Sequence, residues 1–520
     1  MVMNDIFACY HLPQEALDAH HSLQTLTFSL PKERAADQKT PSKVQLQVPV
    51  LTTAELEKVV QRIKQARSSY LARLSTGELV ELIDEAVWKW LDSRYEWRQV
   101  AEEFLPVVTG YDREMIRLFL GRYLRRFRRE SLLRIIDEDF PNPYVLDEFR
   151  PRRAGGMYRA YGPQLITHIF SGNVPVLPVW SIVAGLLLKS ATIGKVSSSE
   201  PLFPVLFART IAEIEPRVAE TMAMLWWKGG DDELERAAFR QSEAVIAYGG
   251  QKTTQAIARK VPSGVRFVEH GHKVSFGVVT NEALQQTKVW DIARRAAEDV
   301  SWFDQQGCLS PHVFFVEEGG QISVKDFARI LAQEMDRFER KMPRAVLSTA
   351  ENQAIITKRS EAEFQSLHWG DTQISGGDEL DAGAEDHHPN DAETELHHSE
   401  QGTAWTVIYQ ANPSAFPFSV LNRMVTVVPI KCMEELTDRL KDVQHLLQTA
   451  GVACSPQKFH ALIDILGRAG VNRISYLGEM SQPEPGWHHD GRFHLGELVR
   501  WCDVESTVER KMDELDPWRE

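Results

Sequence analysis

The sequence predicts a mixed α/β protein with more than one domain. Its 520 residues exceed what a single hydrophobic core usually supports. From about residue 160 onward, short apolar runs typical of β-strands alternate with helical stretches, a pattern that indicates mostly parallel sheets. Several of these runs end in glycine- or serine-rich turns, which is where open α/β sheets bind their ligands.

The region up to residue 150 is expected to be largely helical after a short strand-like opening. Thr52, followed three residues later by Glu55, forms a capping-box pattern that predicts the start of a helix. A basic stretch with aromatic residues among its arginines is compatible with nucleic-acid binding. Its arginines are Arg122, Arg125, Arg126, Arg128 and Arg129. No nucleic-acid-binding module accompanies them, so we favour a solvated face or a contact for an anionic ligand or partner.

Residues 165–188 contain no charged side chain and are long enough to span a membrane. Pro175 and Pro178 interrupt the run, and Gly172 with Asn173 adds a turn signal. We therefore expect a strand, a polar turn and a buried helix in this segment, and no membrane span.

The formal charge of −14 is concentrated in one segment, because residues 371–400 hold ten Asp and Glu and no Lys or Arg. Few large apolar side chains accompany these charges, so burial cannot offset the entropy of ordering. The sequence predicts a disordered acidic insert over residues 371–402. Its histidine pairs are compatible with metal binding, but a solvated loop is favoured and no metal is expected. The pairs are His387, His388, His397 and His398.

Five widely spaced cysteines without a CxxC pair argue against a zinc site or a disulfide framework and favour a reducing cytoplasm. Cys308 differs from the others, because it follows Gly307 and precedes a Leu-Ser-Pro turn and a probable strand. Such a loop would expose the sulfur, and a thiolate is a strong nucleophile. The alternative is a structural cysteine.

Strand–turn–helix units precede this loop. One strand, ATIGKV, carries Lys195 and is followed by serines. Another ends in Gly249 and Gly250, where backbone N–H groups can approach a phosphate at a helix N-terminus. A Gly-Gly turn alone is weak evidence, and the G-x-G-x-x-G fingerprint is absent. The strand VRFVE places Glu269 before a glycine turn, as either a general base or an ordinary strand-end glutamate.

Five ordered motifs resemble the aldehyde dehydrogenase superfamily. They are SGNVPVLP with Asn173, TIGKVSSSEP with Lys195, AYGGQKTT with Gly250, VEHGHK with Glu269 and QQGCLSPH with Cys308. Together with the ending RISYLGEMSQPEPGWHHDGRFHLGELVRWCDVE, they are more similar to the acyl-CoA reductase branch of that superfamily, the LuxC family. The likeness extends from about residue 150 to this ending.

The resemblance implies an aldehyde dehydrogenase-like α/β fold. It divides the chain into a largely helical N-terminal region (1–150) and a Rossmann-like NADP-binding domain (151–268). A catalytic domain (269–430) follows, and a C-terminal segment (431–520) completes the fold.

The resemblance also implies the chemistry of the site. Cys308 would attack an acyl carbonyl and carry the acyl group as a thioester. The Asn173 amide and the Cys308 backbone N–H would form the oxyanion hole. Glu269 matches the residue that activates water in hydrolytic members. The cofactor would be bound by Lys195, Ser197, Ser198, Gly249 and Gly250.

Three positions after the lysine, NAD-specific relatives often carry a glutamate that binds the ribose 2′-OH. This chain has Ser198 there, which favours NADPH because a serine can donate to phosphate without like-charge repulsion. Glu200 lies two residues further on and leaves the register open.

The implied function is NADPH-dependent reduction of a long-chain fatty acyl-CoA or acyl-enzyme thioester to the fatty aldehyde. The alternatives are an NAD(P)-dependent dehydrogenase that oxidises aldehyde to acid, and an inactive scaffold. The intact Asn173, Lys195, Glu269 and Cys308 argue against the scaffold. Implied partners are an acyl-donor protein, an acyl-protein synthetase, a thioesterase and further copies of the chain.

Two features depart from the wider superfamily. The Glu-x-Phe-Gly-Pro element that holds the nicotinamide ribose is absent, and FPFSVLNRMVTVVPI stands in its place. A reductase must also prevent Glu269 from activating water against the thioester, and His270 or His272 is the candidate to alter its behaviour.

Overall fold

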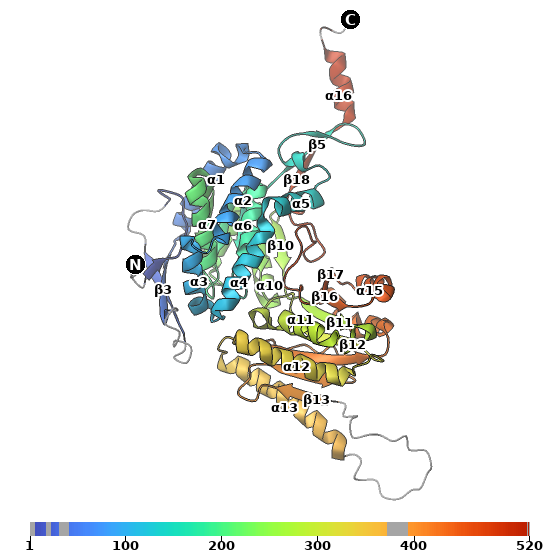
Figure 1. Cartoon of the computed structure of the whole chain (residues 1–520). Coiled ribbons are helices and arrows are strands. Elements are labelled where there is room, and N and C mark those ends of the chain that lie inside the picture. The colour runs from blue at the N-terminus through green and yellow to red at the C-terminus, as the bar shows by residue number, and fades with distance from the viewer. Residues whose placement is uncertain (1–5, 17–21, 31–40, 372–393, 517, 519–520) are drawn as a thin grey trace, which may run out of the picture. The chain divides into compact units, whose positions relative to one another are not determined.

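The structure is a computed structural model that describes residues 6–16, 22–30, 41–371, 394–516 and 518 (Figure 1). Tertiary contacts divide the chain into two units. The first comprises Met1–His272 with Glu484–Glu520, and the second comprises Lys273–Pro483. The domain boundaries drawn from the sequence stay predictions, and each unit is described by itself.

The first unit is built on a parallel five-stranded sheet with strand order β10-β9-β6-β7-β8. Its strands are β6 Leu165–Ile169, β7 Ala191–Lys195, β8 Met222–Leu225, β9 Ala244–Tyr248 and β10 Arg266–His270. Numbered from β6, the order is 3-2-1-4-5, that of a doubly wound nucleotide-binding fold. The predicted parallel α/β sheet is confirmed.

Helices cover both faces of this sheet. On one face, apolar residues of α1, α9 and α10 join those of the strands in one core. On the other face, α6 and α7 pack against β7 and β8. These helices are α1 Thr53–Ser69, α6 Pro178–Leu187, α7 Leu202–Ile214, α8 Pro216–Ala219, α9 Asp232–Gln241 and α10 Gln251–Ala258. The expected strand, polar turn and buried helix at residues 165–188 are confirmed as β6, its turn and α6.

A helical layer packs outside α7, with α2 and α3 in contact with it and α4 beside α2, in blue to cyan in Figure 1. The layer comprises α2 Thr76–Leu91, α3 Glu96–Thr109, α4 Arg113–Leu124 and α5 Arg129–Asp139. The predicted capping box is confirmed, because the side chains of Thr52 and Glu55 each bind the other residue's backbone N–H at the start of α1.

The basic stretch is not one helix. After α4 ends, Arg128 takes an extended conformation as the N-cap of α5 and breaks the helical hydrogen bonding. Arg128 binds Asp84 and Arg129 binds Glu81, each at 2.5 Å, on the neighbouring α2. Two arginines of this stretch therefore serve ion pairs between helices.

Two small sheets complete the first unit. One has strand order β1-β3-β2, with β1 Ile6–Ala8, β2 Leu23–Ser29 and β3 Lys43–Pro49. The other has strand order β18-β5-β4, with β4 Arg150–Pro151, β5 Met157–Tyr161 and β18 Arg500–Val504, and α16 Ser506–Met512 follows it. The C-terminal segment thus returns to the N-terminal unit.

The second unit contains a seven-stranded sheet with order β13-β14-β15-β12-β11-β16-β17. All neighbouring strands are parallel except β13 and β14. Its strands are β11 Val274–Val279, β12 Pro311–Glu317, β13 Thr394–His398, β14 Thr406–Gln410, β15 Met424–Ile430, β16 Leu447–Ala453 and β17 Arg473–Tyr476.

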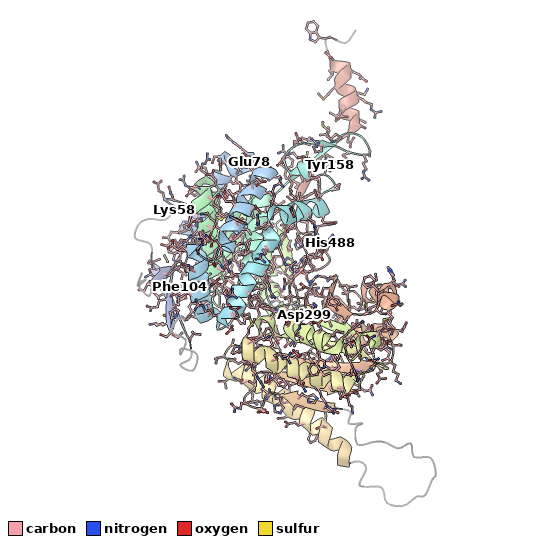
Figure 2. All side chains as sticks on the ribbon, in the orientation of Figure 1. Lys58, Glu78, Phe104, Tyr158, Asp299 and His488 are labelled. Carbon is pink, nitrogen blue, oxygen red and sulfur yellow. The ribbon has the colours of Figure 1, made fainter. Side chains whose placement is uncertain are left out.

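Two apolar cores lie on opposite faces of this sheet, one with α11 and α12 and the other with α14 and α15. The helices are α11 Val289–Ser301, α12 Val324–Lys341, α13 Thr349–Asp371, α14 Leu436–Leu440 and α15 Pro456–Arg468. Asp299, labelled in Figure 2, is fully buried on α11 and accepts the backbone N–H groups of Gly478 and Met480. This contact ties the turn after β17 to α11.

The acidic insert needs one correction. Residues 372–393, including His387 and His388, lie outside the described residues. Residues 394–398 form β13, paired with β14, so the expected disorder across 371–402 is wrong for this end of the segment. Thr394 packs inward there, and the partly buried strand satisfies its backbone by pairing.

Within the described part of the chain, no helix combines the length and apolar character needed to cross a lipid bilayer.

The close packing of β11 on β12 leads to a stability prediction. A Cβ added to Gly277 would lie 2.1 Å from a ring carbon of Phe314. Gly277→Ala should therefore destabilise the protein by about 1–3 kcal/mol, measured by urea unfolding. Gly121→Ala in α4 is the control, because its Cβ would meet no atom within 4 Å and should be neutral or stabilising. Equal effects of the two substitutions would contradict the packing.

Candidate active site

The residues predicted to bind cofactor and acyl oxygen meet at one edge of the five-stranded sheet. They follow, or lie at, the carboxyl ends of β6, β7, β9 and β10. They are Asn173, Lys195, Ser197, Ser198, Gly249, Gly250 and Glu269. The strand order reverses at β6, which lies between β7 and β9. Ligands bind at such reversal points in open α/β sheets.

The loop after β6 is fixed from the helical region. The Tyr111 hydroxyl, between α3 and α4, donates a 2.6 Å hydrogen bond to the backbone carbonyl of Asn173. Asn173 itself is exposed. Val176 has φ of 76° although it is β-branched and 1% exposed, so this loop is strained. The surrounding packing holds the loop in one conformation.

The loop after β7 packs closely against the loop after β6. The hydroxyls of Ser197 and Ser199 are 3.0 Å apart, and a Cβ on Gly172 would clash with both. Ser198 points elsewhere, and its hydroxyl accepts a 3.0 Å bond from the indole of Trp226. Lys195 is buried, and this burial lowers the pKa of its ammonium.

Glu200 serves as a helix cap. It is 1% exposed, and its Oε1 accepts the backbone N–H groups of Leu202 and Phe203 at 2.8 Å each, at the start of α7. Burial raises the pKa of this carboxyl to about 7. A buried carboxylate committed to this cap is poorly placed to bind a ribose hydroxyl.

The Gly249-Gly250 turn opens α10. Gly250 is its N-cap, no side chain caps the helix, and a Cβ on Gly250 would meet no atom within 4 Å. The space beside Gly250 is therefore open, whereas the Gly249 N–H donates a 3.2 Å bond to the His270 carbonyl.

Glu269 lies at the end of β10 and is half-buried. Its Oε1 accepts a 3.0 Å hydrogen bond from the Thr254 hydroxyl on α10. Its backbone carbonyl accepts a 2.7 Å bond from the Arg492 guanidinium of the C-terminal segment. Both bonds lie within the first unit.

His270 contacts Asp490 through its Nδ1 at 2.7 Å and stacks between the rings of Tyr248 and His489. Ligand atoms of His270, His489 and Asp490 lie within 4.8 Å of one another. The two imidazoles are nearly parallel, with an interplanar angle of 15° and centroids 4.4 Å apart. In-plane nitrogen lone pairs of stacked rings do not converge, so this cluster fits a structural clamp better than a metal site.

In the second unit, Cys308 is exposed on the loop before β12. Its backbone carbonyl accepts a 2.8 Å bond from the Ser275 hydroxyl of β11, and Ser310 N–H donates to Gly307 to close a turn. The loop thus presents the sulfur to solvent while its backbone is tied to the sheet.

The left-handed residues before Cys308 are Phe303, Asp304 and Gln305, with φ of 48°, 51° and 67°, and not Gly307. A second left-handed run covers Leu421, Asn422 and Arg423. Each such residue costs about 1–2 kcal/mol. Specific contacts must offset that strain.

Arg423 supplies those contacts, although it is 0% exposed. Its guanidinium binds Asp304 at 2.8 Å and Glu339 at 2.6 Å and donates to the Met342 carbonyl. The other Asp304 oxygen accepts the Ala345 N–H. A buried cation paired this completely holds the two left-handed runs together.

Gln305 reinforces the junction. Its amide donates to the carbonyls of Pro311 and Met424 and accepts from the Met424 N–H and the Ser419 hydroxyl. The segment that stands in place of the missing Glu-x-Phe-Gly-Pro element therefore anchors the Cys308 loop.

The sequence analysis missed these supporting residues: Tyr111, Thr254, Asp304, Arg423, Asp490 and Arg492. Arg423 did carry a signal, because an arginine directly before the strand run MVTVV needs a buried partner. Its carboxylate partners, Asp304 and Glu339, lie 119 and 84 positions away, and nothing in the sequence identifies them.

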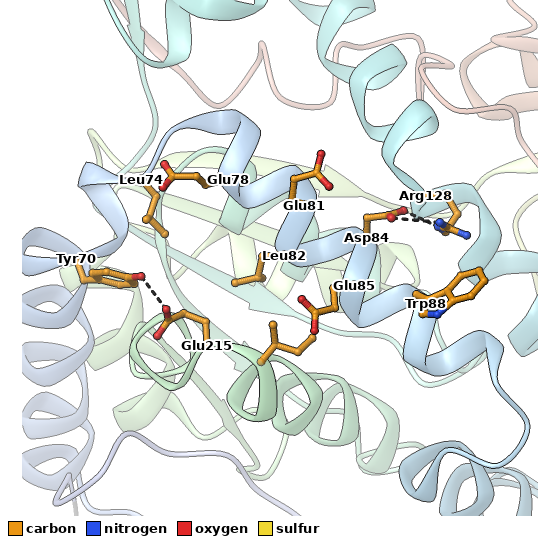
Figure 3. Close-up of a pocket in the computed structure, with 11 residues that line it drawn as sticks. Tyr70, Leu74, Glu78, Glu81, Leu82, Asp84, Glu85, Trp88, Arg128 and Glu215 are labelled. Carbon is orange, nitrogen blue, oxygen red and sulfur yellow. Dashed lines mark hydrogen bonds and ion pairs between the residues drawn. The ribbon is translucent and has the colours of Figure 1, made fainter.

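A groove of about 630 Å³ on the helical region, shown in Figure 3, is not part of this site. Carboxylates line it, among them Glu78, Glu81, Asp84 and Glu85, and none of the predicted site residues does. These charges would repel the phosphates of a nucleotide or of CoA. Figure 3 shows Asp84 bound to Arg128 across the groove.

Comparison with known proteins identifies a matching family. The model of the family described as acyl-CoA reductase (LuxC) matches residues 71–379 and 388–501. Long-chain acyl-protein thioester reductases of Vibrio harveyi and Aliivibrio fischeri are each 24% identical, over 446 and 440 residues, which are 84% and 83% of each chain. The match begins in the helical region, well before the residue-150 start expected from the motifs.

Solved structures with the same fold are aldehyde dehydrogenases. The aldehyde dehydrogenase KauB from Pseudomonas aeruginosa has a TM-score of 0.71 at 12% identity and 96% coverage of both chains. Aldehyde dehydrogenase 21 from Physcomitrella patens has a TM-score of 0.69 at 11% identity, over 96% of this chain and 98% of its own. The predicted aldehyde dehydrogenase-like fold is confirmed.

The Arg423 contacts predict how the nucleophile loop depends on them. Arg423→Met should destabilise the protein by about 3–5 kcal/mol in urea unfolding, because Asp304 and Glu339 lose their buried partner. Amide hydrogen exchange over residues 303–310 should accelerate. Arg340→Met, which breaks an exposed ion pair on α12, should cost less than about 1 kcal/mol. Unchanged exchange in the loop would contradict this role for Arg423.

Proposed function

Because the chain belongs to the acyl-CoA reductase (LuxC) family, we propose that it reduces a long-chain fatty acyl thioester to the fatty aldehyde. In this proposal the reductant is NADPH, and Cys308 carries the acyl group as a thioester between acylation and reduction. The chain is then an oxidoreductase acting on acyl groups.

One observation carries the proposal: an exposed cysteine on a loop with a fully paired support. Cys308 is accessible, whereas Cys9 is fully buried and burial raises the pKa of its thiol. A nucleophile must be accessible and held in a fixed geometry to act as an acyl carrier. The contacts of Asp304, Gln305 and Ser275 meet that need.

The chemistry is a balanced two-step exchange. The Cys308 thiolate adds to the acyl carbonyl, and the donor's C–S bond breaks to release a thiolate that takes up a proton. NADPH supplies, when bound, the hydride that reduces the thioester carbon. The bond from carbon to Cys308 Sγ then breaks, releasing aldehyde and restoring the thiolate.

Asn173 is proposed as an oxyanion donor together with the Cys308 backbone N–H. The hydrogen bond from Tyr111 and the strained turn at Val176 support this, because they hold the Asn173 loop in place before substrate binds. Preorganised donors are what make oxyanion stabilisation large.

The residues at the carboxyl edge of the first unit's sheet fit a dinucleotide. Lys195 and Ser198 are proposed to bind the adenosine ribose and its 2′-phosphate, with Ser197 shaping the same loop. Gly249 and Gly250 are proposed to bind a phosphate, and Gly250 leaves open space at an uncapped helix start. Because Glu200 is engaged in capping α7, no carboxylate of this loop is placed to select NAD over NADP.

The acyl donor is proposed to be a fatty acyl-CoA or an acyl group carried on a protein. The two reductases reported above are named for long-chain acyl-protein thioesters. By resemblance, an acyl-protein synthetase and a thioesterase are the proposed partners.

The covalent step gives the sharpest test. Incubation with long-chain acyl-CoA, without NADPH, should leave an acyl group on Cys308 that neutral hydroxylamine removes. Adding NADPH should discharge it as aldehyde. Cys308→Ser should lose most turnover, because a hydroxyl lacks thiolate nucleophilicity at neutral pH, and Asn173→Ala should slow it by about a hundredfold. Peptide mass spectrometry locates the adduct.

Cys432→Ser is the control, because Cys432 is also exposed but should not carry the acyl group. An adduct on another cysteine, or aldehyde formation with no adduct, would contradict the proposed acyl-Cys308 intermediate. Parallel assays with aldehyde plus NADP and no CoA test the competing oxidative dehydrogenase, which should be the weaker activity.

Cofactor choice gives a separate prediction. Ser198→Glu should raise the KM for NADPH at least tenfold and leave the KM for NADH unchanged or lower, because a carboxylate repels the 2′-phosphate and accepts from the 2′-OH. Ser93→Glu, at an exposed loop position, controls for the added charge. A KM for NADPH that does not change would place the ribose elsewhere.

A further inference from the structure

The carboxylate of Glu269 is held against α10 in its own unit. Thr254, which donates to Glu269 Oε1, is 0% exposed and so cannot exchange this partner for water. Its hydroxyl has one proton, and the competing acceptor is the Gln251 carbonyl at 3.2 Å. The shorter, charge-assisted bond to the carboxylate is the stronger of the two.

Gly271 leaves the space that this conformation needs. A Cβ at position 271 would lie 2.9 Å from Glu269 Oε1, closer than side chains tolerate. A larger residue would therefore displace the carboxylate from its position beside Thr254. The glycine and the threonine favour the same Glu269 rotamer by independent means.

The backbone that carries Glu269 is fixed as well. Arg492 binds the Glu269 carbonyl, and the next residue, His270, is held by Asp490 and by stacking on Tyr248 and His489. If the end of β10 moved and carried the Glu269 carboxylate with it, all of these contacts would break. The carboxylate can therefore change position only by rotation of its own side chain away from Thr254.

Hydrolysis of an acyl-cysteine needs a base. The oxygen of water must add to the thioester carbon while its proton passes to that base, and the C–S bond then breaks to give acid and thiolate. A base must come within hydrogen-bond reach of the attacking water. A carboxylate fixed by a buried donor loses one acceptor site and the freedom to reorient.

We propose that Thr254 is a positioning residue that, with the space left by Gly271, holds Glu269 out of its water-activating role, so that the acyl group is kept for reduction to aldehyde. This inference rests on the proposed acyl-Cys308 chemistry. It assigns the suppression of hydrolysis to Thr254 and Gly271, whereas the sequence had suggested His270 or His272.

The test measures the fate of the acyl-enzyme. Thr254→Val keeps the shape and removes the hydroxyl, so acid release from the acyl-enzyme without NADPH should accelerate on the order of tenfold. Reduction of the preformed acyl-enzyme by NADPH should change less than about threefold, because the hydroxyl is not assigned a role in that step. Thr254→Ser, which keeps the hydroxyl, should behave as the unmodified chain does.

Control variants separate faster acid release caused by a freed Glu269 from faster release caused by a general loss of stability. Thr221→Val removes another buried threonine hydroxyl of the same unit, bonded to the Val218 carbonyl, and should leave acid release unchanged. Gly271→Ala should accelerate acid release by displacing the carboxylate directly. Adding Glu269→Gln to Thr254→Val should return acid release to its slow rate.

Acid release from Thr254→Val at the unmodified rate would overturn the inference alone. Fast release that survives Glu269→Gln would also overturn it, since the base would then be another group. If the unmodified chain forms no acyl-enzyme with long-chain acyl-CoA, the proposed function and this inference fail together.

Discussion

A single buried guanidinium joins the two left-handed segments that support the loop carrying Cys308. Arg423 is removed from water, so its charge and donors must be satisfied by Asp304, Glu339 and the Met342 carbonyl. Asp304 lies in a left-handed run at residues 303–305, and Arg423 ends another at residues 421–423. The strain is local, and the consequence is functional: the chain emerges at Cys308 with its sulfur exposed and its carbonyl tied to Ser275.

Each unit carries different residues of the proposed site. The first brings polar groups to one sheet edge because parallel strands end together, so order 3-2-1-4-5 groups residues separated by almost one hundred positions. The second carries the exposed Cys308 and the residues that support its loop. The hydrogen bonds from Tyr111 to Asn173, from Thr254 to Glu269 and from Ser275 to Cys308 each lie inside one unit.

Sequence alone predicted what depends on local pattern. The alternation of strands and helices gave the parallel sheets, the Thr52–Glu55 pair gave a helix start, and the motif order pointed to the family. The sequence failed where the cause is a distant partner: the basic stretch breaks at Arg128, and residues 394–398 pair as a strand with β14. The roles of the predicted site residues stay predictions. The residues that hold them in position could be identified only from the three-dimensional structure.

A thioester is open to attack by both hydride and water, so a reductase and a hydrolytic dehydrogenase can share the same nucleophile and oxyanion donors. The difference must then lie in what the nearby base is free to do. In this chain Glu269 is restrained by Thr254 on the neighbouring helix and by Arg492 from the C-terminal segment, more than two hundred positions away. The residues that restrain it lie in other motifs of the chain, Thr254 at the end of AYGGQKTT and Arg492 in the C-terminal ending. The motifs contain these residues, but only the fold shows that they contact Glu269.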